Sequence, residues 1–169
     1  SEDGRLREQA VVARVRAAGA VLLGPNCMGL YDAAAELDLA TSDFVPGGLG
    51  VVSQSGNLAI ELSLLGKDVG LGISRFVSIG NQADLEAAEL VAALGEHEPT
   101  RLIAVYLEDF RDGRAFARAA AEAGKPVVLL AGGQSAAGVR AARSHTGALV
   151  SDSIAVDAAC SAAGIVRVS

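Results

Sequence analysis

The most constraining feature of this sequence is the alternation, from residue 49 onward, of short apolar runs with longer segments that place apolar residues at helical spacing. Continuous apolar runs bounded by turn residues are typical of strands buried on both faces, and such strands are parallel when helices connect them. We therefore predict an α/β fold with a doubly wound parallel sheet of about five strands. The strands are expected at 49–53, 73–79, 102–108, 126–131 and 165–168, and the helices at 57–70, 83–96, 112–123 and 152–163.

The first 48 residues follow this pattern less clearly. Residues 5–18 repeat apolar and basic positions at helical spacing and stop at Gly19, which predicts a helix. An apolar run at 20–23 predicts a short buried strand, and residues 30–48 are expected to be irregular, with a turn at 46–48. Because the first helix has no strand before it and the chain stops directly after a strand, we expect a piece of a longer protein.

Composition and charge exclude several classes of function. Of the 169 residues, 51% are hydrophobic, but none is tryptophan, so alanine and valine supply most of the apolar surface. Such small side chains suit thin, closely packed layers of strand and helix. The formal charge of −6 argues against a nucleic-acid partner and against an anionic membrane surface.

The two cysteines, Cys27 and Cys160, are far apart and lack the spacing of a metal site, so we predict no metal site and a reduced, cytoplasmic protein. The first residues are charged rather than apolar, unlike a signal peptide. The sequence contains no apolar run of the roughly 18 residues that a membrane span needs.

In an open parallel sheet, ligands bind outside the carboxyl ends of the strands, so the residues that follow each strand are the candidates for a site. Ser55, Gly56 and Asn57 follow the strand at 49–53 and open a helix, where backbone N–H groups suit a phosphate. The alternative is that Ser55 and Asn57 are plain helix caps. The next such turn, 80–84, contains Asp84 as a plausible cap.

Two further candidates are a carboxylate and an imidazole. Glu108 ends the strand at 102–108, although a solvated loop acid would also fit there. His145 follows a glycine-rich run after the strand at 126–131, and it could act as a nucleophile or base oriented by Glu108, or could cap a helix or face solvent. His97, at a helix end on the opposite edge, is expected to be a surface residue.

Nucleophilic catalysis by serine or cysteine is a minor alternative. The segment SQSGN, residues 53–57, is similar to a nucleophile elbow but lacks its first glycine. Asp84 or Glu108, followed by His145, would complete a triad in the right order. Cys27, in a tight turn, is better explained by packing than by nucleophilic reactivity.

Six motifs in order along the chain resemble a known family. They are GPNCMGL (24–30), VVSQSGNLA (51–59), SIGNQADL (78–85), YLEDFRDGRAF (106–116), KPVVLLAGG (125–133) and SHTGAL (144–149). Together they resemble the second, flavodoxin-like domain of the α-type half of NDP-forming acyl-CoA synthetases. The forms SHTGAL and SIGN-AD are closer to the ADP-forming acetyl-CoA type than to succinyl-CoA synthetase.

The resemblance implies a role for each candidate residue. His145 would be the phosphohistidine, which takes the phosphoryl group of an acyl phosphate and passes this phosphoryl group to ADP. CoA would be the carrier of the acyl group. Glu108 would hold the imidazole ring and stabilise its phosphorylated form. Ser55, Gly56 and Asn57 would cradle the phosphate, together with Gly147 of the histidine loop, and Asn26 and Cys27 would lie near the CoA thiol.

The resemblance also implies partners that this chain does not supply. Residues 1–19 would be the last helix of an N-terminal, Rossmann-like CoA-binding domain, and 20–169 the flavodoxin-like phosphohistidine domain. CoA, ATP or ADP and Mg²⁺ would bind mainly to other parts, including an ATP-grasp domain or subunit, in an oligomeric parent. The carboxylic acid, and the choice between ATP and GTP, stay open, and the fragment alone would be inactive.

Two departures from the family pattern and one alternative function remain. Gln82 stands where acetyl-type proteins usually carry lysine, which puts any charge contact from that position in doubt. Asp109 stands where glycine is common and adds negative charge beside the presumed phosphate. The alternative is a ligand-sensing, synthetase-like domain fused to a protein lysine acetyltransferase; the presence of both His145 and Glu108 favours the enzyme.

Overall fold

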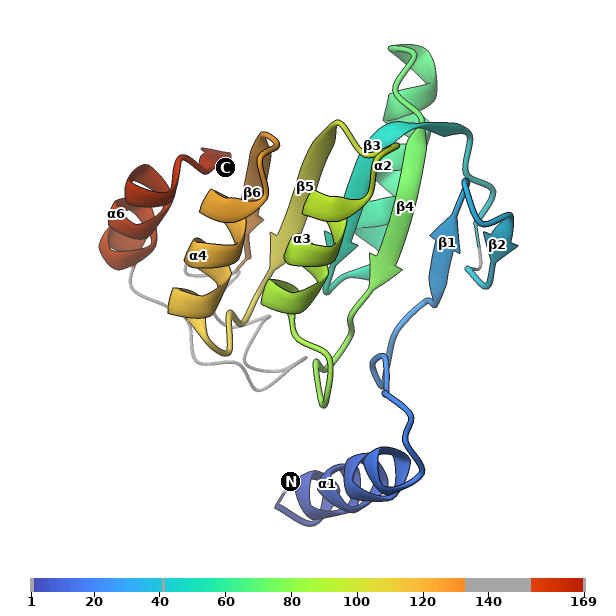
Figure 1. Cartoon of the computed structure of the whole chain (residues 1–169), viewed down its shortest axis with the longest axis vertical. Helices are drawn as coiled ribbons and strands as arrows, with labels where there is room; N and C mark the ends of the chain where they lie inside the picture. The colour runs from blue at the N-terminus through green and yellow to red at the C-terminus, as the bar shows by residue number, and fades with distance from the viewer. Residues whose placement is uncertain (1, 41, 133–152, 169) are drawn as a thin grey trace.

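A seven-stranded sheet is the centre of the molecule in the computed structural model, which describes residues 2–40, 42–132 and 153–168 (Figure 1). The order of the strands is β2-β1-β4-β3-β5-β6-β7. Their bounds are β1 Leu30–Asp32, β2 Leu37–Asp38, β3 Pro46–Ser53, β4 Ile73–Ser78, β5 Leu102–Leu107, β6 Val127–Ala131 and β7 Val166–Val168.

The strands from β3 onward are parallel and lie in the order β4-β3-β5-β6-β7. Numbered along the chain, this is the 2-1-3-4-5 order of flavodoxin-like sheets, which confirms the predicted fold class. The sheet has seven strands rather than about five because β1 and β2 add a short antiparallel hairpin beside β4. The expectation that residues 30–48 are irregular is therefore wrong for this hairpin.

Helices lie on both faces of the sheet. Figure 1 shows α3, α4 and α6 on one face and α2 on the other. The chain passes from β3 to β4 on one side of β3 and then crosses to β5 on the other side of β3. These two connections run in opposite directions across the sheet, so their helices, α2 and α3, lie on opposite faces. The helix bounds are α1 Glu2–Ala17, α2 Gly56–Asp68, α3 Ala87–Glu96, α4 Gly113–Glu122 and α6 Ser153–Ala163.

The larger part of the core lies between the sheet and α3, α4 and α6. In β5, Ile103 and Leu107 are fully buried on this face, and Phe116 of α4 packs in the same cluster. A second cluster on the other face joins Phe76 of β4 to Tyr31 of β1. The hairpin is thus packed into the core through the aromatic side chain of Tyr31.

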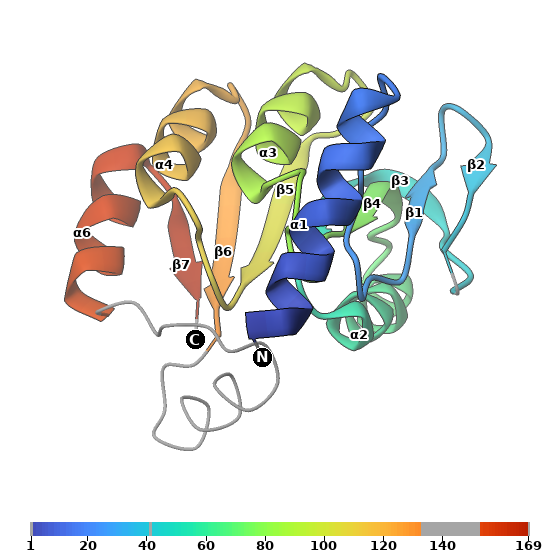
Figure 2. The same cartoon turned by 90° about the horizontal axis from the view of Figure 1, so that it is seen from below.

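The predicted strand at 20–23 is absent. This segment belongs to no strand and pairs with no strand of the described sheet. Instead, the Leu22 N–H donates to Oδ2 of Asp84 at 2.7 Å, and Arg16 of α1 donates to Oδ1 of the same carboxylate, also at 2.7 Å. The segment therefore connects α1 to the sheet. Figure 1 shows α1 standing apart from the main layers, and in Figure 2, seen from below, it overlaps the sheet.

His97 is not the surface residue that we expected. Its side chain is only 8% exposed, and its Nδ1 atom lies 2.8 Å from Oγ1 of Thr100. Burial, and then the charge of nearby Arg75, lower the pKa of His97, although Asp32 opposes this shift. The residue packs into a polar cluster where α3 leads into β5, at the amino end of that strand.

None of the described helices combines the length and the apolar character that crossing a membrane requires.

Candidate functional site

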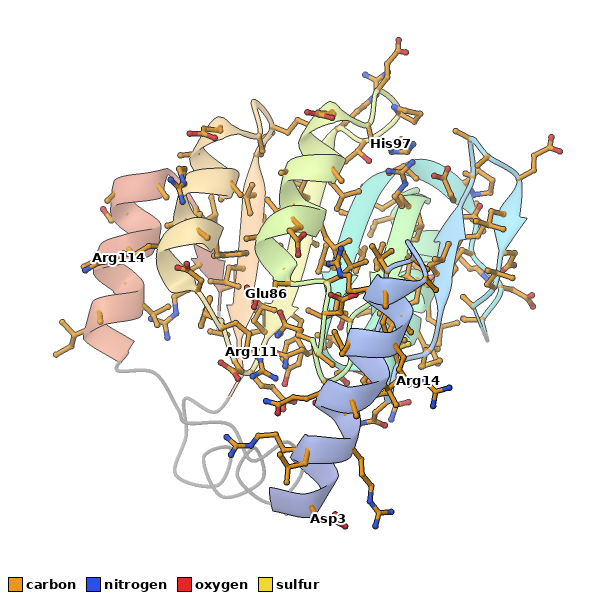
Figure 3. The ribbon with its side chains drawn as sticks, turned by 60° about the horizontal axis from the view of Figure 1, so that its bottom comes forward. Asp3, Arg14, Glu86, His97, Arg111 and Arg114 are labelled. Carbon is orange, nitrogen blue, oxygen red and sulfur yellow. The ribbon has the colours of Figure 1, made fainter. Side chains whose placement is uncertain are left out.

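Four loops meet at the carboxyl edge of the parallel sheet: 24–29, 54–57, 80–84 and 108–112. Backbone hydrogen bonds join the first to the third, from the Asn81 N–H to the Pro25 carbonyl at 2.9 Å and from the Ala83 N–H to the Gly24 carbonyl at 3.0 Å. Figure 3 brings this edge forward, with Arg111 labelled there and His97 at the far end of the molecule. The structure thus brings together the loops that sequence reasoning selected separately.

The second and fourth of these loops meet at the topological switch point. β3 is the strand from which the connections diverge, so the crevice between the ends of β3 and β5 is the place where open α/β sheets bind ligands. Gln54, directly after β3, donates its backbone N–H to the Tyr106 carbonyl at 3.0 Å. Glu108, directly after β5, is therefore a neighbour of the residues that open α2.

The Glu108 carboxylate is only half satisfied by hydrogen bonds. Its Oε1 atom accepts a bond from the Tyr106 hydroxyl group at 3.1 Å. Its Oε2 atom is buried and accepts no hydrogen bond within the described residues. A buried carboxylate oxygen without a donor is costly in free energy, so this atom is suited to an N–H or O–H group brought by a ligand or by another part of the protein.

Gly132 connects this carboxylate to the segment that follows β6. A Cβ atom at position 132 would lie 3.0 Å from Cγ of Glu108 and 2.8 Å from the Tyr106 hydroxyl oxygen. The absence of a side chain thus lets the backbone pass directly against Glu108. Two predicted site residues, His145 and Gly147, belong to the segment 133–152 and lie outside the described residues.

The N-terminus of α2 lacks a side-chain cap. Ser55 occupies the cap position, but its side chain accepts no hydrogen bond from the helix. The interpretation of Ser55 as a plain cap is therefore wrong, and the first N–H groups of α2 have no intrahelical acceptor. Met28 packs against this end, since a Cβ atom on Gly56 would lie 1.9 Å from the Met28 sulfur.

Asn26 and Cys27 lie in the loop that joins this helix start to the turn at 80–84. Asn26 is exposed and has a positive φ of 57°. The Cys27 thiol is partly buried and donates to the Leu23 carbonyl at 3.7 Å, an arrangement typical of packing rather than of an activated nucleophile. Of these two side chains, Asn26 is the one that is open to a ligand.

Left-handed backbone conformations cluster at this edge. Asn26, Gln82 and Arg111 have positive φ values of 57°, 51° and 54°, and each lies in one of the four loops. Such conformations cost free energy in residues other than glycine and are concentrated at functional sites. Their grouping is independent support for a site at this edge.

Asp84 was expected as a plausible cap of the helix, but it does not cap α3. The helix begins at Ala87, and Glu86 and Glu89 form a capping box around that start. Asp84 instead accepts the hydrogen bonds from Leu22 and Arg16, which lower the pKa of its carboxyl group. Because both oxygens are occupied in this way, Asp84 is a poor acid for a catalytic triad.

The two departures from the family pattern have structural explanations. Gln82 is only 3% exposed; its Nε2 donates to the Asp109 carbonyl at 2.9 Å and its Oε1 accepts from the Ala87 N–H at 3.1 Å. The Asp109 carboxylate accepts the Arg111 N–H at 3.0 Å and lies 3.5 Å from its guanidinium. Gln82 thus fixes loops rather than supplying charge, and Arg111 partly neutralises Asp109.

Comparison with known proteins now identifies the fold family. A family model described as the succinyl-CoA ligase like flavodoxin domain matches residues 46–169. The chain belongs to this family. The resemblance drawn from the six sequence motifs is thereby confirmed.

Named relatives specify the branch of the family. The chain is 38% identical to the alpha subunit of ADP-forming acetate–CoA ligase I of Pyrococcus furiosus and 34% identical to the ADP-forming 4-hydroxybutyrate–CoA ligase of Nitrosopumilus maritimus. These alignments cover 98% and 99% of this chain but only 37% and 25% of the relatives. The chain therefore corresponds to a minor part of each of these ligases.

A solved structure gives the same result. The acetyl-coenzyme A synthetase 1 of Ca. Korarchaeum cryptofilum, in complex with phosphate and ADP, superposes with a TM-score of 0.88 at 33% sequence identity. The match covers 95% of this chain and 36% of that one. This structural relative is thus an acetyl-coenzyme A synthetase whose structure contains phosphate and ADP.

Sequence reasoning missed several residues that organise this site. Gln54, Tyr106 and Met28 contact the predicted site residues Glu108 and Gly56 directly. Gln54 and Met28 lie within motifs that we had recognised, and Tyr106 lies two positions before Glu108 on the same strand. Residues at i and i+2 of a strand point to the same face, so Tyr106 could have been found by that rule.

Proposed function

We propose that this chain is the phosphohistidine domain of an ADP-forming acyl-CoA synthetase, an acid–thiol ligase. His145 would carry the phosphoryl group, and Glu108 would hold the imidazole. The observation that carries the proposal is the buried Oε2 atom of Glu108, which accepts no hydrogen bond within the described residues. The imidazole N–H of His145 would supply the hydrogen-bond donor that this atom lacks within the described residues.

The geometry supports a phosphate site next to this carboxylate. The N-terminus of α2 has no side-chain cap, and its N–H groups and helix dipole favour an anion. Ser55, Gly56 and Asn57 would bind the phosphate there, with Gly147 of the histidine loop. The ADP and phosphate of the Korarchaeum relative are consistent with this assignment.

The chemistry divides one difficult reaction into displacements. In the direction of ATP synthesis, phosphate attacks the acyl-CoA carbonyl and displaces the CoA thiol, which gives an acyl phosphate. A nitrogen of His145 attacks the phosphorus, the bond to the acyl oxygen breaks, and the carboxylate leaves. A terminal oxygen of ADP then attacks the same phosphorus, the N–P bond breaks, and ATP and the free imidazole are formed.

Other parts of a parent enzyme would supply the remaining partners. CoA would bind to a preceding domain, of which α1 would be the last helix, with its thiol near Asn26 and Cys27. An ATP-grasp domain or subunit would bind the nucleotide with Mg²⁺. The described residues contain no group of three or more His, Cys, Asp or Glu side chains that could hold a metal, and no step proposed for this chain uses one.

Transfer of labelled phosphate tests this function. We would mix the chain with an ATP-grasp partner and ATP labelled at the γ-phosphate, and expect acid-labile label on wild type but none on His145→Asn. The matched control is His97→Asn, since the chain has two histidines and His97 lies at the opposite edge; this variant should retain the label. An unlabelled wild-type chain, with a partner shown to bind ATP, would contradict the catalytic function and favour a ligand-sensing domain.

A further inference from the structure

We propose that Gln54 is a positioning residue that fixes Glu108 for its partner; this inference rests on the proposed function. The Gln54 side-chain oxygen accepts two hydrogen bonds, from the Glu108 N–H at 2.6 Å and from the Asp109 N–H at 2.9 Å. One side chain directly after β3 therefore holds two consecutive backbone groups just beyond the end of β5.

Regular strand pairing does not hold this turn. The parallel ladder between β3 and β5 runs only as far as Ser53 and Tyr106. Glu108 and Asp109 lie beyond this pair, so their N–H groups need another acceptor. Without the Gln54 oxygen, these two N–H groups would lose their acceptor, and the neighbouring bonds that remain are made to carbonyl groups, from the Gly132 N–H to Leu107 and from Gln82 to Asp109.

The chemistry of an amide suits this position. The Gln54 oxygen accepts two N–H groups without bringing a negative charge next to the Glu108 carboxylate. The amide nitrogen can donate, and it lies 3.5 Å from the Gly80 carbonyl of the neighbouring loop. A glutamate would accept the same bonds but would add a like charge beside Glu108.

Gln54 also links the two halves of the site. It immediately precedes Ser55 and Gly56, where the phosphate would bind, and it holds the backbone of Glu108, which would bind the imidazole. Its position therefore sets the distance between the two groups that must meet during phosphoryl transfer. Misplacement of reacting groups by about 1 Å can reduce a rate by about 100-fold.

The test compares Gln54→Leu with Thr100→Val. Leucine fills a similar volume but accepts no hydrogen bond. Thr100→Val is the matched control, because it removes the buried hydroxyl group that bonds Ser74 and His97 at the opposite end of the sheet. We would measure the initial rate of His145 labelling, the hydrogen exchange of the Glu108 and Asp109 amides, and thermal unfolding.

We expect Gln54→Leu to expose both amides to exchange and to slow labelling by about 10- to 100-fold, while Thr100→Val labels at nearly the wild-type rate. Equal labelling rates in the two variants would overturn the inference. If Gln54→Leu does not fold, Gln54→Asn decides, since the shorter amide withdraws the acceptor oxygen without adding a charge. Faster exchange of both amides together with slower labelling would support the inference; labelling at the wild-type rate, or slower labelling with protected amides, would overturn it.

The control with unmodified protein separates the two proposals. Wild-type chain that takes up label establishes the proposed function, whatever the variants do. Wild-type chain that takes up no label contradicts that function and, with it, the role given to Gln54.

Discussion

The Tyr106 hydroxyl group donates to Oε1 of Glu108 at 3.1 Å, and burial together with this carboxylate raises the pKa of Tyr106 to about 12. The hydroxyl group therefore stays protonated, and stays a donor, across the whole range in which an enzyme works. Glu108 thus has one permanent donor on Oε1 and keeps Oε2 for another group.

Titration of Tyr106 tests this relationship. Since its pKa in the folded chain lies above the ordinary value, its contribution to stability is complete below about pH 10 and is lost as the pH rises through about 12. Ultraviolet absorbance of the Tyr31→Phe variant isolates Tyr106, because the chain has two tyrosines. Adding Glu108→Gln should lower the midpoint; a midpoint near the ordinary value in folded Tyr31→Phe would contradict the prediction.

The buried cluster around His97 should make the folded chain sensitive to mild acid. Burial and the charge of Arg75 lower the pKa of His97, so the neutral ring is favoured in the folded state. Its contribution to stability is present above the ordinary histidine pKa of about 6.5 and is lost as the pH falls through the lower folded value. The urea midpoint of wild type should therefore fall between pH 7 and 5, as a rough window.

Two histidine variants identify the source of this sensitivity. His97→Gln should flatten the fall in the urea midpoint, whereas His145→Gln should keep it, and the chain has no third histidine. The same slope in wild type and His97→Gln would show that another group is responsible.

The contact between the loops at 24–29 and 80–84 depends on Gly80. This residue has a φ of +50°, and a Cβ atom would lie 2.2 Å from the Pro25 carbonyl oxygen. Gly80→Ala should lower the free energy of unfolding by about 1–3 kcal/mol through strain and should separate the two loops. Gly70→Ala is the control: its φ is +72° but its surroundings are open, so it should cost only about 1 kcal/mol.

Denaturant unfolding of the two glycine variants measures this difference. An equal loss in both variants would mean that the close approach to Pro25 adds nothing to the backbone strain. A larger loss in Gly80→Ala, with unchanged unfolding slope, would confirm the contact.

The carboxylate of Asp84 should hold α1 near the site. Asp84→Ala removes the acceptor of the Leu22 N–H and of Arg16, so hydrogen exchange in residues 2–22 should become faster. Asp3→Ala removes only the exposed pair with Arg7 inside α1 and should leave this exchange unchanged. Slow exchange in Asp84→Ala would show that other contacts hold the helix.

The parallel part of the fold was predictable from the sequence because each of its strands is a continuous apolar run. The hairpin was not, since β1 and β2 have three and two residues and form only by pairing with β4. The apolar run at 20–23 satisfied the local criterion for a strand but has no partner in the described sheet. Pairing between strands is a tertiary property, and local pattern does not contain it.

The site was predictable to a similar degree. The rule that ligands bind at the carboxyl ends of strands selected three of the four loops that the structure brings together, and the resemblance to the family added the loop at 24–29. The roles of Gln54 and Gln82 were not predictable, because an amide side chain has no characteristic spacing. His97 was assigned wrongly because two neighbouring glutamates suggested a surface, whereas its own side chain turns inward to Thr100.

The hydrogen bonds between the loops at 24–29 and 80–84 involve backbone atoms on both sides. Amide and carbonyl groups are the same in every residue, so the side chains of Asn26, Cys27 and Asn81 can be exchanged during evolution without breaking this joint. The glycines are the exception, because the close approach at Gly80 tolerates no side chain. Descendants of one ancestral domain can in this way differ in the side chains of these two loops while inheriting the same framework.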